Sequence, residues 1–145
     1  MQPIHADLHP WNPMWHEGEI ALFDFDDSGI GLPIQDLAIG IYYLDTDEQR
    51  AALLAGYESV APLPVYSAKQ MALLLLQRRS LLLNYLYETS NPEHAELIPE
   101  YQAETFRRIS RCRLGKSSWY SIYKWHPSLH KTQHCWRKTF GHQIA

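Results

Sequence analysis

The stretch that decides the fold of this chain is residues 5–12, which read His-Ala-Asp-Leu-His-Pro-Trp-Asn, followed later by Asp-Phe-Asp-Asp at residues 24–27. It offers a carboxylate at Asp7, a carboxamide at Asn12 and a second carboxylate at Asp24. Phosphoryl transfer from ATP needs such a set, because one Asp orients the attacking hydroxyl while an Asn and another Asp hold Mg²⁺. Magnesium prefers hard oxygen ligands of this kind. The H-x-D-x-x-x-x-N spacing also matches the catalytic loop of protein kinases.

Between these two blocks the sequence predicts a β-hairpin, with short strands at residues 13–15 and 20–23 joined by a turn. Two short strands make a compact excursion that returns the chain to its starting point. We therefore expect Asp24 to lie beside Asn12, at the start of a loop over residues 24–29.

Residues 33 to 111 carry helical patterns of apolar spacing, capping boxes and Asn-Pro punctuation. Four helices are predicted: one beginning at Pro33, one opened by residues 46–49, a long apolar one opened by residues 67–70 and ending near Glu88, and one running from Asn91-Pro92 to about Arg111.

These blocks, with Pro33-Ile-Gln-Asp-Leu-Ala at residues 33–38, resemble the aminoglycoside phosphotransferase family of kinase-like small-molecule phosphotransferases. That group includes type II homoserine kinases and choline-kinase relatives, and the Asp-Phe-Asp-Asp form is similar to the bacterial stress-response Ser/Thr kinase branch. The resemblance covers residues 3 to 111. It implies an α+β, mainly α fold: a protein-kinase-like C-terminal lobe over residues 1–111, with a small β-hairpin carrying the metal site and the N-terminal lobe absent.

The resemblance also implies a role for individual residues, with ATP as co-substrate, Mg²⁺ as cofactor and a hydroxyl of a small molecule or of Ser/Thr as acceptor. No residue of this chain is implied for the nucleotide base. The implied assignments are Asp7 as the catalytic Asp, Asn12 and Asp24 as Mg²⁺ ligands, Asp36 as a brace of catalytic loop 5–12 through backbone amides, His5 as a packing residue of that loop, and Asp26 and Asp27 as substrate or second-metal contacts.

The chain departs from the family pattern in three places. Trp11 stands where the family usually has Gly, and Pro13, which lacks a backbone donor, stands where a small aliphatic residue is usual. No Gly-rich phosphate loop precedes Asp7, and no Lys for the phosphates does either. We therefore expect a truncated kinase that is inactive alone and needs its missing N-terminal lobe in cis or in trans.

The charge of −3 conceals a strong asymmetry along the sequence. Up to Glu104 there are 16 Asp/Glu and four Lys/Arg, whereas residues 105–145 hold nine Lys/Arg and no acid. Residues 112–145 also lose the helical period. We expect this basic aromatic tail to be poorly ordered or translated out of frame. An alternative is a nucleic-acid-binding module acting through phosphates and stacking, which we regard as the weaker interpretation.

A rival enzyme class follows from the histidines near Asp7. His5, Asp7 and His9, with His16 further on, could form a transition-metal site, since His and carboxylate ligands bind zinc well. This alternative predicts a metal-dependent hydrolase, in which Pro10 and Asn12 have no role.

The remaining composition excludes several classes of protein. The longest apolar block, Met71–Leu76, is far shorter than the about 20 residues needed to cross a bilayer. The first residues lack the basic and apolar regions of a secretory signal, and two Cys are too few for a disulfide scaffold. We therefore expect a cytoplasmic protein without membrane partners, with apolar helix surface that invites self-association.

Overall fold

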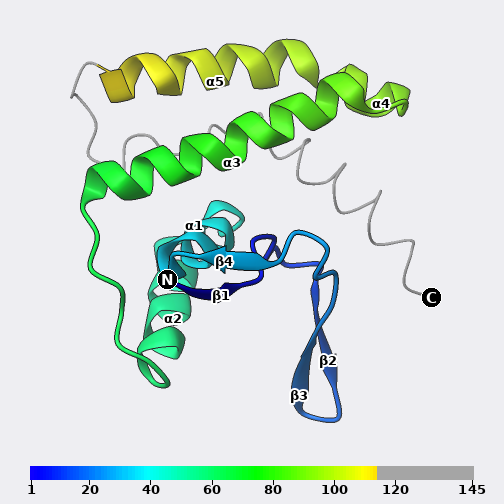
Figure 1. Ribbon diagram of the computed structural model, residues 1–145. Coiled ribbons are helices and arrows are strands. Elements are labelled where there is room, and N and C mark those ends of the chain that lie inside the picture. Colours follow the sequence, from blue (N-terminus) through cyan, green and yellow to red (C-terminus); the bar gives the residue numbers. More distant parts are fainter. Residues whose placement is uncertain (114–145) are drawn as a thin grey trace. The chain divides into compact units, whose positions relative to one another are not determined.

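The computed structural model describes residues 1–113, which divide into two compact units, Met1–Leu75 and a second unit beginning at Leu76 (Figure 1). Each unit is described by itself below. The expectations for residues 114–145 lie outside the described residues. Within the described part of the chain, no helix is both long and apolar enough to cross a membrane.

The first unit begins with four short strands: β1 (Gln2–Ile4), β2 (Pro13–His16), β3 (Glu19–Leu22) and β4 (Gly29–Gly31). They form two antiparallel pairs, β1 with β4 and β2 with β3. The predicted hairpin is confirmed, and its two-residue turn has positive φ at Glu17 and Gly18, as hairpin turns of this length favour. The β1–β4 pair was not predicted, so the loop expected over residues 24–29 ends one residue early, where Gly29 enters β4.

The two strand pairs are nested, and this arrangement positions the site. Ile4 pairs with Gly29 in one ladder, and Pro13 pairs with Leu22 in the other. The β1–β2 loop (residues 5–12) and the β3–β4 loop (residues 23–28) are therefore each fixed at both ends. Because the same two ladders bound both loops, the loops lie next to each other.

Helix α1 (Pro33–Tyr42) follows β4 and supplies the buried apolar face of this unit. Its buried side chains recur at helical spacing and are those of Ile34, Leu37, Ala38 and Ile41. At the junction Gly31 is closely packed, since a Cβ there would lie 2.3 Å from Ile4 Cδ1 and 2.7 Å from Gln35 Oε1. A Cβ at this position would force the ends of the Ile4 and Gln35 side chains to shift.

The capping boxes place the next two helices as predicted. Thr46 Oγ1 accepts from the Gln49 amide at 3.2 Å and α2 spans Asp47–Glu58; Ser67 Oγ accepts from the Gln70 amide at 3.2 Å and α3 spans Ala68–Glu88. Each Gln side chain also accepts from the backbone amide of its N-cap residue. The reciprocal bonds satisfy donors that a helix start otherwise leaves unpaired.

The single helix predicted from Asn91 to about Arg111 is wrong, because it is two helices, α4 (Pro92–Ala95) and α5 (Ile98–Arg113). The reason is Pro99, whose ring would clash with the carbonyl of Ala95 if the helix continued. Near the start of α5 the missing amide of a proline costs nothing.

Helices α3 and α5 pack against each other in the second unit through buried polar groups (Figure 1). Arg79 donates from Nε to Thr105 Oγ1 at 2.9 Å, and from Nη2 to the Tyr101 carbonyl at 3.2 Å. Its guanidinium carbon lies 3.9 Å from the centre of the Tyr101 ring. Within α5, Glu104 accepts from Arg108 Nε at 2.8 Å. Burial alone would raise the pKa of Glu104, but this bond and the surrounding arginine charges lower it on balance.

His94 of α4 is the most deeply buried polar residue of the described chain, at 0% exposure. Its ring centre lies 5.7 Å from that of Tyr85 on α3. Burial lowers the pKa of His94, because the apolar surroundings disfavour the charged imidazolium.

Candidate functional site

Asp36, in the first turn of α1, holds the start of the β1–β2 loop. Its two carboxylate oxygens accept from the backbone amides of His5 at 2.9 Å and Ala6 at 2.8 Å. Ala6 has φ 63°, a left-handed backbone conformation that costs energy for residues other than glycine. The bidentate contact is what a brace of this loop requires, and it stabilises the backbone immediately before Asp7.

His5 is buried and connects the two loops. Its Nδ1 accepts from the Asp7 amide at 3.3 Å, and its Nε2 lies 2.8 Å from the carbonyl oxygen of Phe23. The tautomer with the proton on Nε2 satisfies both contacts, since a carbonyl can only accept. The Phe25 ring covers His5 with ring centres 4.7 Å apart. His5 is therefore a packing residue that also ties the end of β3 to the backbone of Asp7.

Asp7 and Asn12 are in contact across the β1–β2 loop. The Asn12 Nδ2 donates to the Asp7 carbonyl at 2.9 Å and lies 3.5 Å from Asp7 Oδ2. Asn12 is buried, whereas the Asp7 side chain keeps 16% of its surface exposed. With its nitrogen facing Asp7, Asn12 has its carboxamide oxygen as the atom that can ligate a cation.

Asp24 is the second residue of the β3–β4 loop and follows the residue that contacts the other loop. The Phe23 amide donates to the Asn12 carbonyl at 3.0 Å, so Asp24 directly follows the residue that is hydrogen-bonded to Asn12. Asp24 is exposed and has φ 61°, the strained counterpart of Ala6 on the other loop. Asp26 and Asp27 are exposed in the turn that follows.

Trp11, which departs from the family pattern, is accommodated by aromatic contacts. Its ring centre lies 5.7 Å from that of Tyr43 at an interplanar angle of 87°, and 5.4 Å from that of His9. Edge-to-face contacts at these distances are favourable. Pro13 is the first residue of β2, a position where its missing amide is tolerated. Both departures are thus compatible with the loop.

The donor set of the two loops fits magnesium better than zinc. Asn12 and Asp24 offer hard oxygen atoms, and Mg²⁺ is commonly held by one or two carboxylates plus phosphate oxygens. Among residues 1–113, no three His, Cys, Asp or Glu side chains come close enough together to hold a metal ion. The alternative cluster of His5, Asp7 and His9 is therefore not assembled, because both ring nitrogens of His5 face backbone groups.

Several participants of this site were missed by sequence reasoning. His9 contacts Asp7, with Nε2 at 3.4 Å from Oδ2, although the sequence suggested only a zinc role for it. Phe25 and Tyr43 also pack at the site from outside the β1–β2 loop. His9 and Phe25 lie within the two quoted sequence blocks, which was the only signal for them, whereas Tyr43 lies outside both blocks and had none.

Comparisons with known proteins agree with the motif. The family model described as "Phosphotransferase enzyme family" matches residues 1–69. The amicoumacin kinase of Bacillus subtilis (strain 168) is 46% identical over 39 residues, which are 27% of this chain and 12% of that protein. No solved structure matches the chain. Residues 1–69 are therefore similar to this phosphotransferase family, in agreement with the resemblance of the motif to the aminoglycoside phosphotransferases.

Proposed function

We propose that this chain is the catalytic-loop portion of a kinase that transfers the γ-phosphoryl group of ATP to a hydroxyl acceptor. The observation that carries the proposal is the contact of Asn12 with Asp7, together with the backbone bond from Phe23, the residue before Asp24, to Asn12. The family match supports the reaction class. The groups that grip the nucleotide would come from an N-terminal lobe outside these residues, in cis or in trans.

In this proposal each side chain has a distinct task. Asp7 orients the acceptor hydroxyl and accepts its proton, which is the task of the equivalent carboxylate in kinases. Asn12 and Asp24 would hold Mg²⁺, which neutralises charge on the phosphates when bound. Asp36 keeps the amides of His5 and Ala6 in place, so that Asp7 meets the acceptor in a fixed geometry. Asp26 and Asp27 would contact substrate or a second metal ion.

The first test concerns the cation and needs only this chain. Titration of the ¹⁵N-labelled protein with Mn²⁺ should broaden the backbone signals of residues 12 and 24 before others. Asp24→Asn should weaken Mn²⁺ binding about tenfold or more, because a charged ligand is lost. The control is Asp45→Asn, an exposed Asp outside both loops, which should bind as the unmodified chain does. Equal binding by both variants would contradict the proposed metal site.

The second test concerns the reaction. The protein purified from its native host is incubated with γ-labelled ATP, Mg²⁺ and acceptors that bear hydroxyl groups: amicoumacin, an aminoglycoside, choline, homoserine and a Ser/Thr peptide. Labelled product should form with one of them and vanish in Asp7→Ala. Transfer that survives Asp7→Ala would refute the assigned role. The intact mass of the same sample tells whether the protein extends beyond 16.9 kDa.

A further inference from the structure

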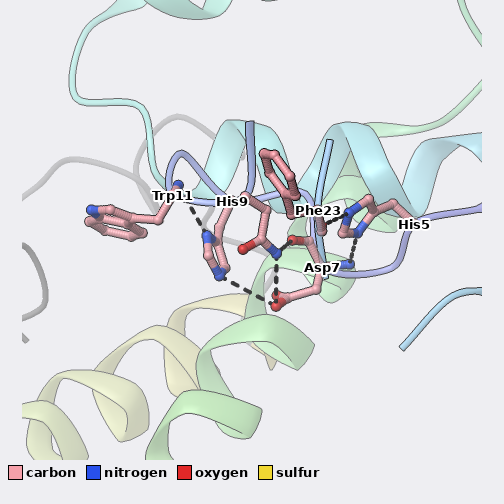
Figure 2. Close-up of polar contacts among 6 residues, drawn as sticks. His5, Asp7, His9, Trp11 and Phe23 are labelled. Atoms are coloured by element: carbon pink, nitrogen blue, oxygen red, sulfur yellow. Dashed lines mark hydrogen bonds and ion pairs between the residues drawn. The ribbon is translucent and has the colours of Figure 1, made fainter. Parts of the chain in front are cut away.

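His9 lies between the side chain of Asp7 and the aromatic residues around Trp11 (Figure 2). Its Nε2 is 3.4 Å from Asp7 Oδ2, the same oxygen that the Asn12 amide approaches at 3.5 Å. Two donors thus approach one oxygen of the carboxylate, from the loop that carries it. A carboxylate held at one oxygen has its rotation about χ2 restricted.

The orientation of the His9 ring is itself fixed by three contacts. The Trp11 amide donates to His9 Nδ1 at 3.2 Å. The rings of Trp11 and Tyr43 lie edge-on to it, with centres 5.4 and 5.8 Å away. Because Nδ1 accepts a hydrogen bond, the neutral ring carries its proton on Nε2, which is the atom that faces Asp7.

We propose that His9 is a positioning residue, which fixes the Asp7 carboxylate for the acceptor hydroxyl and does not itself touch substrate. The inference rests on the proposed kinase function for its catalytic consequence, but not for the pairing of His9 with Asp7. The backbone supports the same geometry, since the His9 amide donates to the Asp7 carbonyl at 2.8 Å and the Asn12 amide donates to the His9 carbonyl at 3.1 Å. The rings of Trp11 and Tyr43 hold the His9 ring from two sides, so the bulky Trp11 helps to orient His9 toward Asp7.

The geometry supplies a matched pair of variants. In His9→Asn the side chain ends where Nδ1 was, so it can still accept from the Trp11 amide but cannot reach Asp7. In His9→Gln the amide nitrogen extends to the former place of Nε2 and can donate to Asp7. His16→Asn is the control, because the His16 side chain on β2 is 74% exposed and lies outside both loops.

Kinetics of the protein from its native host, with ATP and the acceptor that it phosphorylates, form one arm of the test. His9→Asn should lower kcat about 10- to 100-fold, as small displacements of a catalytic group do, with little change in the KM for ATP. His9→Gln should recover most of the kcat, and His16→Asn should keep it. Equal losses in His9→Asn and His9→Gln, or no loss in either, would overturn the proposal. The circular dichroism spectrum of each variant, compared with that of the unmodified protein, controls for misfolding.

The second arm is independent of activity. Nitrogen-detected NMR of the histidine rings in the full 145-residue chain should show His9 with a protonated Nε2 and an unprotonated Nδ1. The proton on Nε2 should exchange faster with water in Asp7→Ala. A proton on Nδ1, or an exchange rate that ignores Asp7→Ala, would overturn the pairing. If no acceptor is phosphorylated by the unmodified protein, the proposed function fails while this arm still decides the role of His9.

Discussion

Replacement of Asp36 by Ala gives the sharpest prediction for the site. The substitution removes two charge-assisted hydrogen bonds, at 2.9 and 2.8 Å, and leaves the amides of His5 and Ala6 without these partners. A hydrogen bond to a charged group contributes about 1.5–3 kcal/mol. Because Asp36 is half-buried and solvent screens part of this, we expect a loss of about 2–4 kcal/mol in the free energy of unfolding. Such a loss is a large share of the stability of a small domain.

The assay is urea unfolding followed by far-ultraviolet circular dichroism, with amide hydrogen exchange over residues 5–12 as a local readout. The matched control is Glu100→Ala, since Glu100 also lies in the first turn of a helix but is exposed. Substitutions at exposed positions usually change the free energy of unfolding by about 0.5 kcal/mol or less, so this variant should change little. A loss below about 1 kcal/mol in Asp36→Ala, or unchanged exchange in the loop, would refute the bracing argument.

Three further outcomes are expected. Gly31→Ala should lower the free energy of unfolding in urea by about 1–3 kcal/mol, because the new Cβ would overlap neighbouring atoms. Gly29→Ala is the control and should cost less, since a Cβ there would have nothing within 4 Å. Equal losses in the two variants would contradict the close packing at Gly31. Because the pKa of His94 is lowered in the folded protein, the unfolded chain takes up a proton at a higher pH than the folded one. The stability that this residue contributes is therefore complete above about pH 6.5 and falls as the pH decreases below that value. His94→Gln should flatten this part of a curve of stability against pH, and an unchanged slope would refute the argument. The lowered pKa of Glu104 gives stability that is present above about pH 4.5 and is lost as the pH falls through the pKa of the folded state. Glu104→Gln should remove this loss of stability in acid and should also destabilise the protein at neutral pH, since Arg108 loses its carboxylate partner. A stability at neutral pH equal to that of the unmodified protein would count against this role of Glu104.

Local signals in the sequence predicted most of the elements. Thr46 and Ser67 each have a Gln three residues later, and both boxes form with helices beginning at the next residue. The hairpin followed from strand patterns on either side of a Glu-Gly turn. These features succeed because the partners are near in sequence, so the local pattern contains the whole interaction.

Interactions between distant residues could not be read in the same way. The β1–β4 pair joins two three-residue strands, which are too short to show an alternating pattern. Pro99 separates α4 from α5 through the clash of its ring with the carbonyl of Ala95, which the start signal at Asn91-Pro92 does not reveal. The brace by Asp36 was implied by the resemblance alone, since nothing in the spacing indicates which amides it meets. The contact of His9 with Asp7 depends on ring orientation, which Tyr43 helps to set from another element.

The nested ladders also determine the order in which the two loops can form. The β2–β3 hairpin closes over a two-residue turn and so has a small entropic cost of closure. Pairing of β1 with β4 brings together ends that are far apart in the chain, and this becomes easier once the hairpin has shortened the effective loop. We therefore expect the residues around Asp7 and Asp24 to reach their final arrangement late in folding. Unfolding in the reverse order would break the β1–β4 ladder first. Such a limited opening would separate Asp7 from Asp24 while the β2–β3 hairpin stays formed.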